Sequence, residues 1–161
     1  MAAGSTYTPI ATTTLGSSAS DITFSSISGT YTDLILVFNG TASGAANLKV
    51  QLNSDTGTNY SYTALYGTGS AAGSNRESSI TSARAGYITT AQTGTILQFQ
   101  NYSNSTTYKT VLMRDFPSGG DVEAAVSLWR NTAAITSIKF FPSSGTLATG
   151  SIATLYGISA A

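Results

Sequence analysis

The chain has 161 residues, of which 41% are hydrophobic and 9% are charged, with seven acidic and seven basic residues and a net charge of zero. Fifty residues are serine or threonine, and cysteine and histidine are absent. These facts exclude disulfides, thiolate nucleophiles, histidine-based catalysis and cysteine-type zinc sites, and the scattered bases form no footprint for nucleic acid. The length fits one domain with a substantial core, and zero net charge favours self-association.

β-Branched and aromatic residues, interrupted at short intervals by Gly, Asn or Ser, predict strands along the whole chain and almost no helix. The strands predicted in the first half are Tyr7–Thr14, Asp21–Phe24, Thr32–Phe38, Asn47–Leu52 and Asn59–Tyr66. Thr32–Phe38 is the best candidate for a core strand, because Leu34, Leu36 and Phe38 alternate with apolar residues on the opposite face.

The segment Gly67–Ala85 is rich in Gly, Ala and Ser, and we expect it to form a long surface loop, a type of segment that is often functional. The strands predicted after it are Ala85–Thr90, Thr95–Tyr102, Thr107–Asp115, Val122–Arg130, Thr136–Phe141 and Ser151–Ile158. Turn chemistry based on Gly, Pro or Asp separates several of these strands, at 55–57, 93–94, 117–120 and 142–145.

About eight to eleven short, evenly spaced strands in one domain predict an all-β fold, a single antiparallel β-sandwich over residues 1–161 and most simply a jelly roll. The first ten residues have neither a basic nor an apolar region, so no signal peptide is expected. The longest apolar run, Leu34–Phe38, is too short to cross a bilayer, so synthesis in a cytoplasm without membrane contact is expected.

Groups that could support catalysis or bind a metal are few, and each has a structural alternative that we favour. Asp121 and Glu123 share a strand face and resemble the carboxylate pair of a glycosidase, but acidic residues are also common at the solvent-exposed start of a strand. Pairs of serine with Lys49, Lys109 or Lys139 arise by chance when hydroxyls are so abundant.

The stretch 53–59 offers oxygen ligands for calcium, but the same residues form Asx turns. No catalytic residue, cofactor or metal is therefore predicted, and the chain is not expected to be an enzyme.

Contact residues are expected in the tyrosine-rich strand and in the loop after it. Tyr60, Tyr62 and Tyr66 lie on one strand face, where they suit core packing, an oligomer interface or stacking on sugars. Arg76 and Glu77, an adjacent pair of opposite charges, mark the loop as a contact arm.

A series of segments, in this order and spacing, resembles small structural proteins of tailed bacteriophages, common among marine and cyanobacterial phages and described as virion or tail-fibre-like proteins. The segments that carry the resemblance are Tyr7–Leu15, Ile22–Ile27, Thr30–Leu36, Asn53–Tyr62, Leu128–Ile138 and Leu155–Ile158. The resemblance implies a β-sandwich or jelly-roll virion component without catalytic residues, which either decorates the capsid as a trimer or forms part of a fibre.

The sequence has no anchor helix and no coiled-coil or collagen-like shaft, which favours a capsid decoration, or cement, protein over a fibre. The expected partners are further copies of the chain, in a homotrimer, and the major capsid protein or another virion protein. A receptor-binding or glycan-binding domain of a tail or head fibre is the alternative, with a host surface glycan as ligand, and a glycosidase is a third.

Overall fold

The computed structural model describes residues 6–117 and 121–159, and within them it contains twelve strands and no helix. The strands are β1 (Tyr7–Thr14), β2 (Ile22–Phe24), β3 (Asp33–Gly40), β4 (Ala46–Leu52), β5 (Tyr60–Gly67), β6 (Ala72–Ile80), β7 (Ala83–Ile88), β8 (Thr93–Phe99), β9 (Lys109–Pro117), β10 (Val122–Trp129), β11 (Ile138–Pro142) and β12 (Ile152–Ile158). Residues 118–120 of the turn expected at 117–120 lie outside the described part. Nothing in the described ranges is a helix able to span a membrane.

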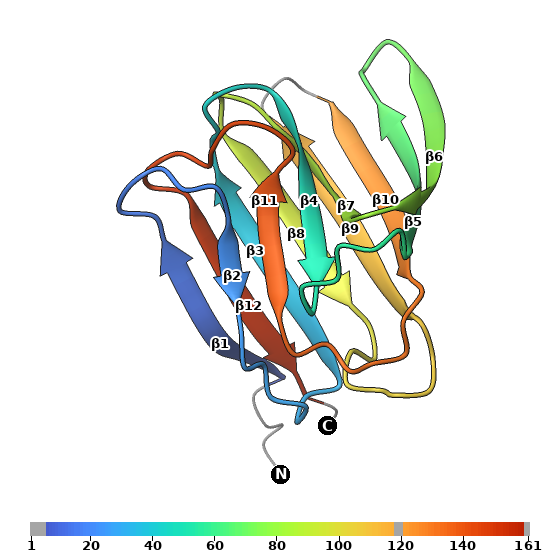
Figure 1. The fold of residues 1–161 in the computed structure, drawn as a ribbon. Helices are drawn as coiled ribbons and strands as arrows, with labels where there is room; N and C mark the ends of the chain where they lie inside the picture. Colours follow the sequence, from blue (N-terminus) through green and yellow to red (C-terminus); the bar gives the residue numbers. More distant parts are fainter. Residues whose placement is uncertain (1–5, 118–120, 160–161) are drawn as a thin grey trace.

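The strands form two antiparallel sheets packed face to face, which confirms the predicted all-β sandwich (Figure 1). The large sheet has eight strands in the order β1-β12-β3-β8-β9-β10-β5-β6, and the small sheet has four in the order β2-β11-β4-β7. A jelly roll divides eight strands between two Greek keys, and this division into eight and four does not confirm that topology.

The core lies between the sheets and is built from the residues that alternate inward along each strand. In β3, Leu34, Leu36 and Phe38 have no accessible surface, as the alternation predicts. Phe38 contacts Phe140 of β11, with ring centroids 4.8 Å apart, and so joins the two sheets. Burial of such side chains contributes roughly 1.5–3 kcal/mol each.

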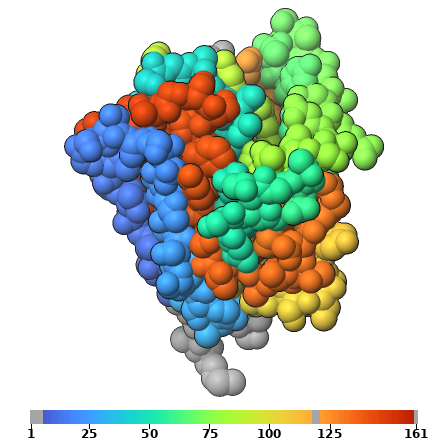
Figure 2. Space-filling model, in the orientation of Figure 1, coloured from blue at the N-terminus to red at the C-terminus, as the bar shows by residue number. Residues whose placement is uncertain are grey.

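The segment expected to be a loop at 67–85 is instead largely a β-hairpin followed by the start of β7. β6 pairs with β5 from Ala72 to Ile80, with one bulge opposite Tyr60 and Ser61. Nearly all of β6 is exposed, so it lacks the apolar alternation from which strands are recognised, and its backbone hydrogen bonds to β5 hold it in place. The hairpin projects from one end of the molecule (Figures 1 and 2).

β7 is an edge strand of the small sheet, and side chains of the large sheet cap its free backbone groups. Ser127 Oγ accepts a hydrogen bond from the Arg84 amide at 3.1 Å, and Asp115 Oδ2 accepts one from the Tyr87 amide at 2.6 Å. The Thr95 hydroxyl donates to the Ala85 carbonyl at 3.0 Å. Such capping keeps a buried strand edge satisfied, and it fixes β7 against β8, β9 and β10.

Candidate functional site

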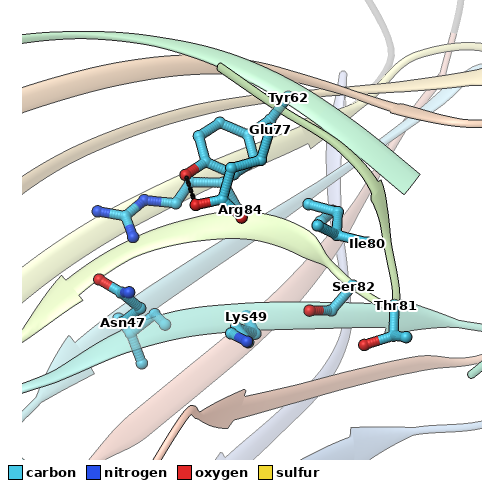
Figure 3. Close-up of a pocket in the computed structure, with 10 residues that line it drawn as sticks. Asn47, Lys49, Tyr62, Glu77, Ile80, Thr81, Ser82 and Arg84 are labelled. Carbon is cyan, nitrogen blue, oxygen red and sulfur yellow. Dashed lines mark hydrogen bonds between the residues drawn. The ribbon is translucent and has the colours of Figure 1, made fainter. Parts of the chain in front are cut away.

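The large sheet extends beyond β7, and the inward faces of β5, β6 and β10 are hollowed there into two adjoining cavities. We call the first the Lys49 cavity; it measures about 440 Å³ and is lined by residues that include Asn47, Lys49, Tyr62, Glu77, Ser82 and Arg84. In Figure 3, Tyr62 and Glu77 lie on one side of this cavity and Asn47 and Lys49 on the other.

The second cavity, which we call the Tyr66 cavity, measures about 410 Å³. The groups that line it include Tyr66, Asn75, Tyr87, Asp115, Asp121 and Glu123. Asn47 and Arg84 line both cavities, so the two meet at these residues.

A partly buried ion pair lies where the two cavities meet. Arg84 Nε and Nη2 donate to the two carboxylate oxygens of Glu123 at 2.8 and 2.6 Å, and both side chains are 12% exposed. Burial alone would lower the pKa of Arg84, but the hydrogen bonds and charge of Glu123 outweigh burial and raise that pKa.

The carboxylate pair considered for a glycosidase reaches the Tyr66 cavity, but its two members differ in environment. Asp121 is exposed, whereas both oxygens of Glu123 are occupied by the Arg84 guanidinium. A carboxylate held in this bidentate way has both oxygens engaged by a cation, which makes it a poor candidate for proton transfer or for attack on a sugar.

Asp115 is a buried acid that the sequence analysis did not single out. It is 6% exposed, and its Oδ1 has no hydrogen-bond partner among the described residues. Burial raises the pKa of Asp115 to about 6, although the hydrogen bond from the Tyr87 amide acts in the opposite direction. Val111 and Met113 point inward on β9, so the same alternation would have placed Asp115 inward.

Tyr60, expected among the contact residues, is instead a core residue. It has no accessible surface and stacks on Trp129, with centroids 6.3 Å apart. Its hydroxyl accepts from the Leu52 amide at 3.0 Å and donates to the Asp55 carbonyl at 3.2 Å. Burial raises the pKa of Tyr60 to about 12, and the side chain is not accessible to a partner.

The other four expected contact residues divide between the two faces of the hairpin. The Tyr62 hydroxyl donates to Glu77 Oε1 at 3.0 Å, and both residues line the Lys49 cavity. Tyr66 is 42% exposed and lines the Tyr66 cavity. Arg76 pairs with Thr63 on the opposite face, because adjacent strand residues point in opposite directions. The structure therefore separates Arg76 from Glu77.

The stretch 53–59 has the structural role that we favoured over calcium binding. Asp55 accepts hydrogen bonds from the Trp129 indole at 2.7 Å, from Asn59 at 2.9 Å and from the Gly57 amide at 2.8 Å. Burial tends to raise the pKa of Asp55, but these hydrogen bonds outweigh it and lower that pKa. Within residues 6–117 and 121–159, no group of three or more acidic side chains could hold a metal ion.

Two of the three lysines considered for serine–lysine pairs have other partners. The buried Lys109 Nζ donates to the carbonyls of Thr107 and Thr132 at 2.7 and 3.0 Å, and burial lowers its pKa. Lys139 lies 3.7 Å from Asp21 on the small sheet. Lys49 remains in the cavity named after it.

The face of the large sheet that points away from the small sheet, which we call the outer face, carries apolar side chains on β3, β5, β8, β9 and β10, among polar ones that include Thr63 and Arg114. Leu65, Phe116, Val122 and Val126 are 64%, 58%, 50% and 53% exposed, and strand pairing brings β5, β9 and β10 together. Half-buried apolar residues continue this face across the neighbouring strands: Ile35, Val37, Ile96, Leu112 and Leu128. On a sheet face that contacts only solvent, most residues are polar, so this apolar content is unusual.

Comparison with known proteins identifies no family for this chain. No protein-family model matches it, and no curated protein is significantly similar. Among solved structures, a sucrose-6-phosphate hydrolase from Lactobacillus gasseri matches 88% of this chain and 28% of its own length, at 11% identity and a TM-score of 0.40.

Two further solved structures are similar at the same low level. An exo-inulinase from Aspergillus awamori matches 94% of this chain and 29% of its own, at 12% identity and a TM-score of 0.35. A scytalido-glutamic peptidase matches 89% of this chain and 66% of its own length, at 14% identity and a TM-score of 0.34. The chain thus spans less than a third of the sucrose-6-phosphate hydrolase and of the exo-inulinase. TM-scores this low support no functional argument.

Proposed function

We propose that the protein is a non-enzymatic structural component of a virion, most specifically a decoration protein that binds and stabilises a phage capsid. The observation that carries this proposal is the apolar outer face of the large sheet. Contiguous exposed apolar surface of this kind marks contact with another protein, and the chain has no net charge to oppose close approach.

Self-association into a trimer is part of the proposal. β1 and β6 are the two open edges of the large sheet, and open edges pair readily with further strands. Serine and threonine at such a surface form hydrogen bonds and lose little side-chain entropy. In a trimer, three weak contacts with capsid subunits act together and give firm attachment.

The proposal is tested by adding purified protein to capsids stripped of it, with the molar mass of the free protein measured in parallel. Trimers that rebind the capsids and raise their resistance to heat are expected. Val126→Lys places a charge in the middle of the outer face and is expected to abolish rebinding, whereas Thr23→Lys, on the exposed face of β2, leaves it intact. Monomers without capsid affinity would refute the proposal.

A further inference from the structure

We propose that the Tyr66 cavity and the Lys49 cavity form one groove that binds a neutral oligosaccharide. This site does not depend on the capsid role, because the groove is formed by the inward faces of β5, β6 and β10 together with β4 and β7. The assembly surface proposed above lies on the opposite face of the same large sheet. The two functions can therefore operate on one molecule at the same time.

The groove presents an aromatic platform of fixed orientation. Tyr66 of β5 is paired with Gly73 of β6, and a Cβ atom placed on that glycine would come within 2.6 Å of the Tyr66 ring. The outer end of the ring therefore lies directly over this glycine, while Tyr66 stays 42% exposed. Tyr87, 37% exposed, lines the same cavity. Tyrosine rings held in this way pack against the apolar C–H face of a sugar and keep a polar tip for its hydroxyls.

Polar groups around this platform suit the dense hydroxyls of a sugar. Asn47 and Asn75 each present an amide that both donates and accepts hydrogen bonds. Asp115, which is only 6% exposed, also lines the cavity. Its Oδ1 has no hydrogen-bond partner among the described residues. An unsatisfied buried acceptor of this kind is unusual, and a ligand hydroxyl that reaches it would supply a donor.

The charges in the Tyr66 cavity select against acidic sugars. Asp115, Asp121 and Glu123 line it, and its single cation, Arg84, is already held by Glu123. In this cavity a sialic or uronic acid would place its carboxylate beside Asp115 and Asp121, whereas neutral sugar hydroxyls can donate to these two acids. The volumes, about 440 and 410 Å³, are of the size at which proteins hold small ligands, about 300–1,000 Å³.

The test is an array of neutral, sialylated and uronic-acid oligosaccharides, followed by calorimetric titration with the neutral glycan that binds most strongly. We expect Tyr66→Ala to weaken that binding at least tenfold and Asn75→Ala to weaken it severalfold. Tyr108→Ala, which removes a 55% exposed tyrosine outside the groove, should leave it unchanged. Amide NMR shifts on glycan addition should cluster on β5, β6 and β7.

Three outcomes would overturn the assignment: no neutral glycan bound, binding restricted to acidic glycans, or a folded Tyr66→Ala variant with wild-type affinity. Capsid rebinding distinguishes this failure from failure of the structural role. Tyr66→Ala should still rebind capsids, whereas Val126→Lys should still bind the glycan.

Discussion

Asp115 should make the stability of the protein depend on pH, and Asp115→Asn should remove that dependence. The pKa of the carboxyl is about 6 in the folded protein and 3.8 when it is solvated. Because the folded pKa is the higher one, the folded state binds the proton more tightly, and the stabilisation is complete below about pH 3.8 and lost as the pH rises through 6. The difference corresponds to a loss of about 3 kcal/mol in the free energy of unfolding.

Urea unfolding at intervals from pH 3.5 to pH 8 measures this effect, and the difference between wild type and Asp115→Asn isolates it from other titrations. The asparagine keeps an oxygen for the Tyr87 amide but does not ionise, so the variant should become the more stable of the two above pH 6. Arg84 and Glu123 face Asp115 and influence its pKa, so the carboxyl titration should also be followed directly by NMR. Parallel stability curves over the whole range would refute the reasoning.

Two further substitutions test the packing around β7. Glu123→Ala leaves the Arg84 guanidinium without its partner, and urea unfolding should show a loss of about 3–5 kcal/mol; a change below 1 kcal/mol would mean that the pair is effectively solvated. Gly86→Ala forces a side chain onto a residue with φ of 117° and within 2.6 Å of Asp115 Oδ2, so its melting temperature should fall by several degrees, as expected for roughly 2 kcal/mol. An unchanged melting temperature would contradict this packing.

The core strands could be predicted from the sequence because the alternation of apolar and polar residues that buries one face of each strand is a local pattern. The inward set of β3, Leu34, Leu36 and Phe38, is the one that alternation indicates. β1 has no buried residue, but it begins and ends where its β-branched residues predict. β6 was missed because cross-strand hydrogen bonds, and not an apolar face, hold it against β5.

The candidate site depends on contacts that no local pattern contains. Arg84 and Glu123 are 39 residues apart in the sequence, and they meet because β10 lies between β9 and β5 in the large sheet while β7 closes the small sheet. Tyr60 lies on the same face of β5 as Tyr62 and Tyr66, as predicted. The sequence could not show that its end of β5 is buried while the end that carries Tyr66 is exposed.

The most direct test of the proposed structural role is a density map of the intact virion at a resolution that places this fold. The expected result is a trimer on the capsid, with the apolar outer face that includes Leu65, Phe116 and Val126 buried against neighbouring subunits. A map in which that face points into solvent, or in which the protein is absent from the particle, would contradict it.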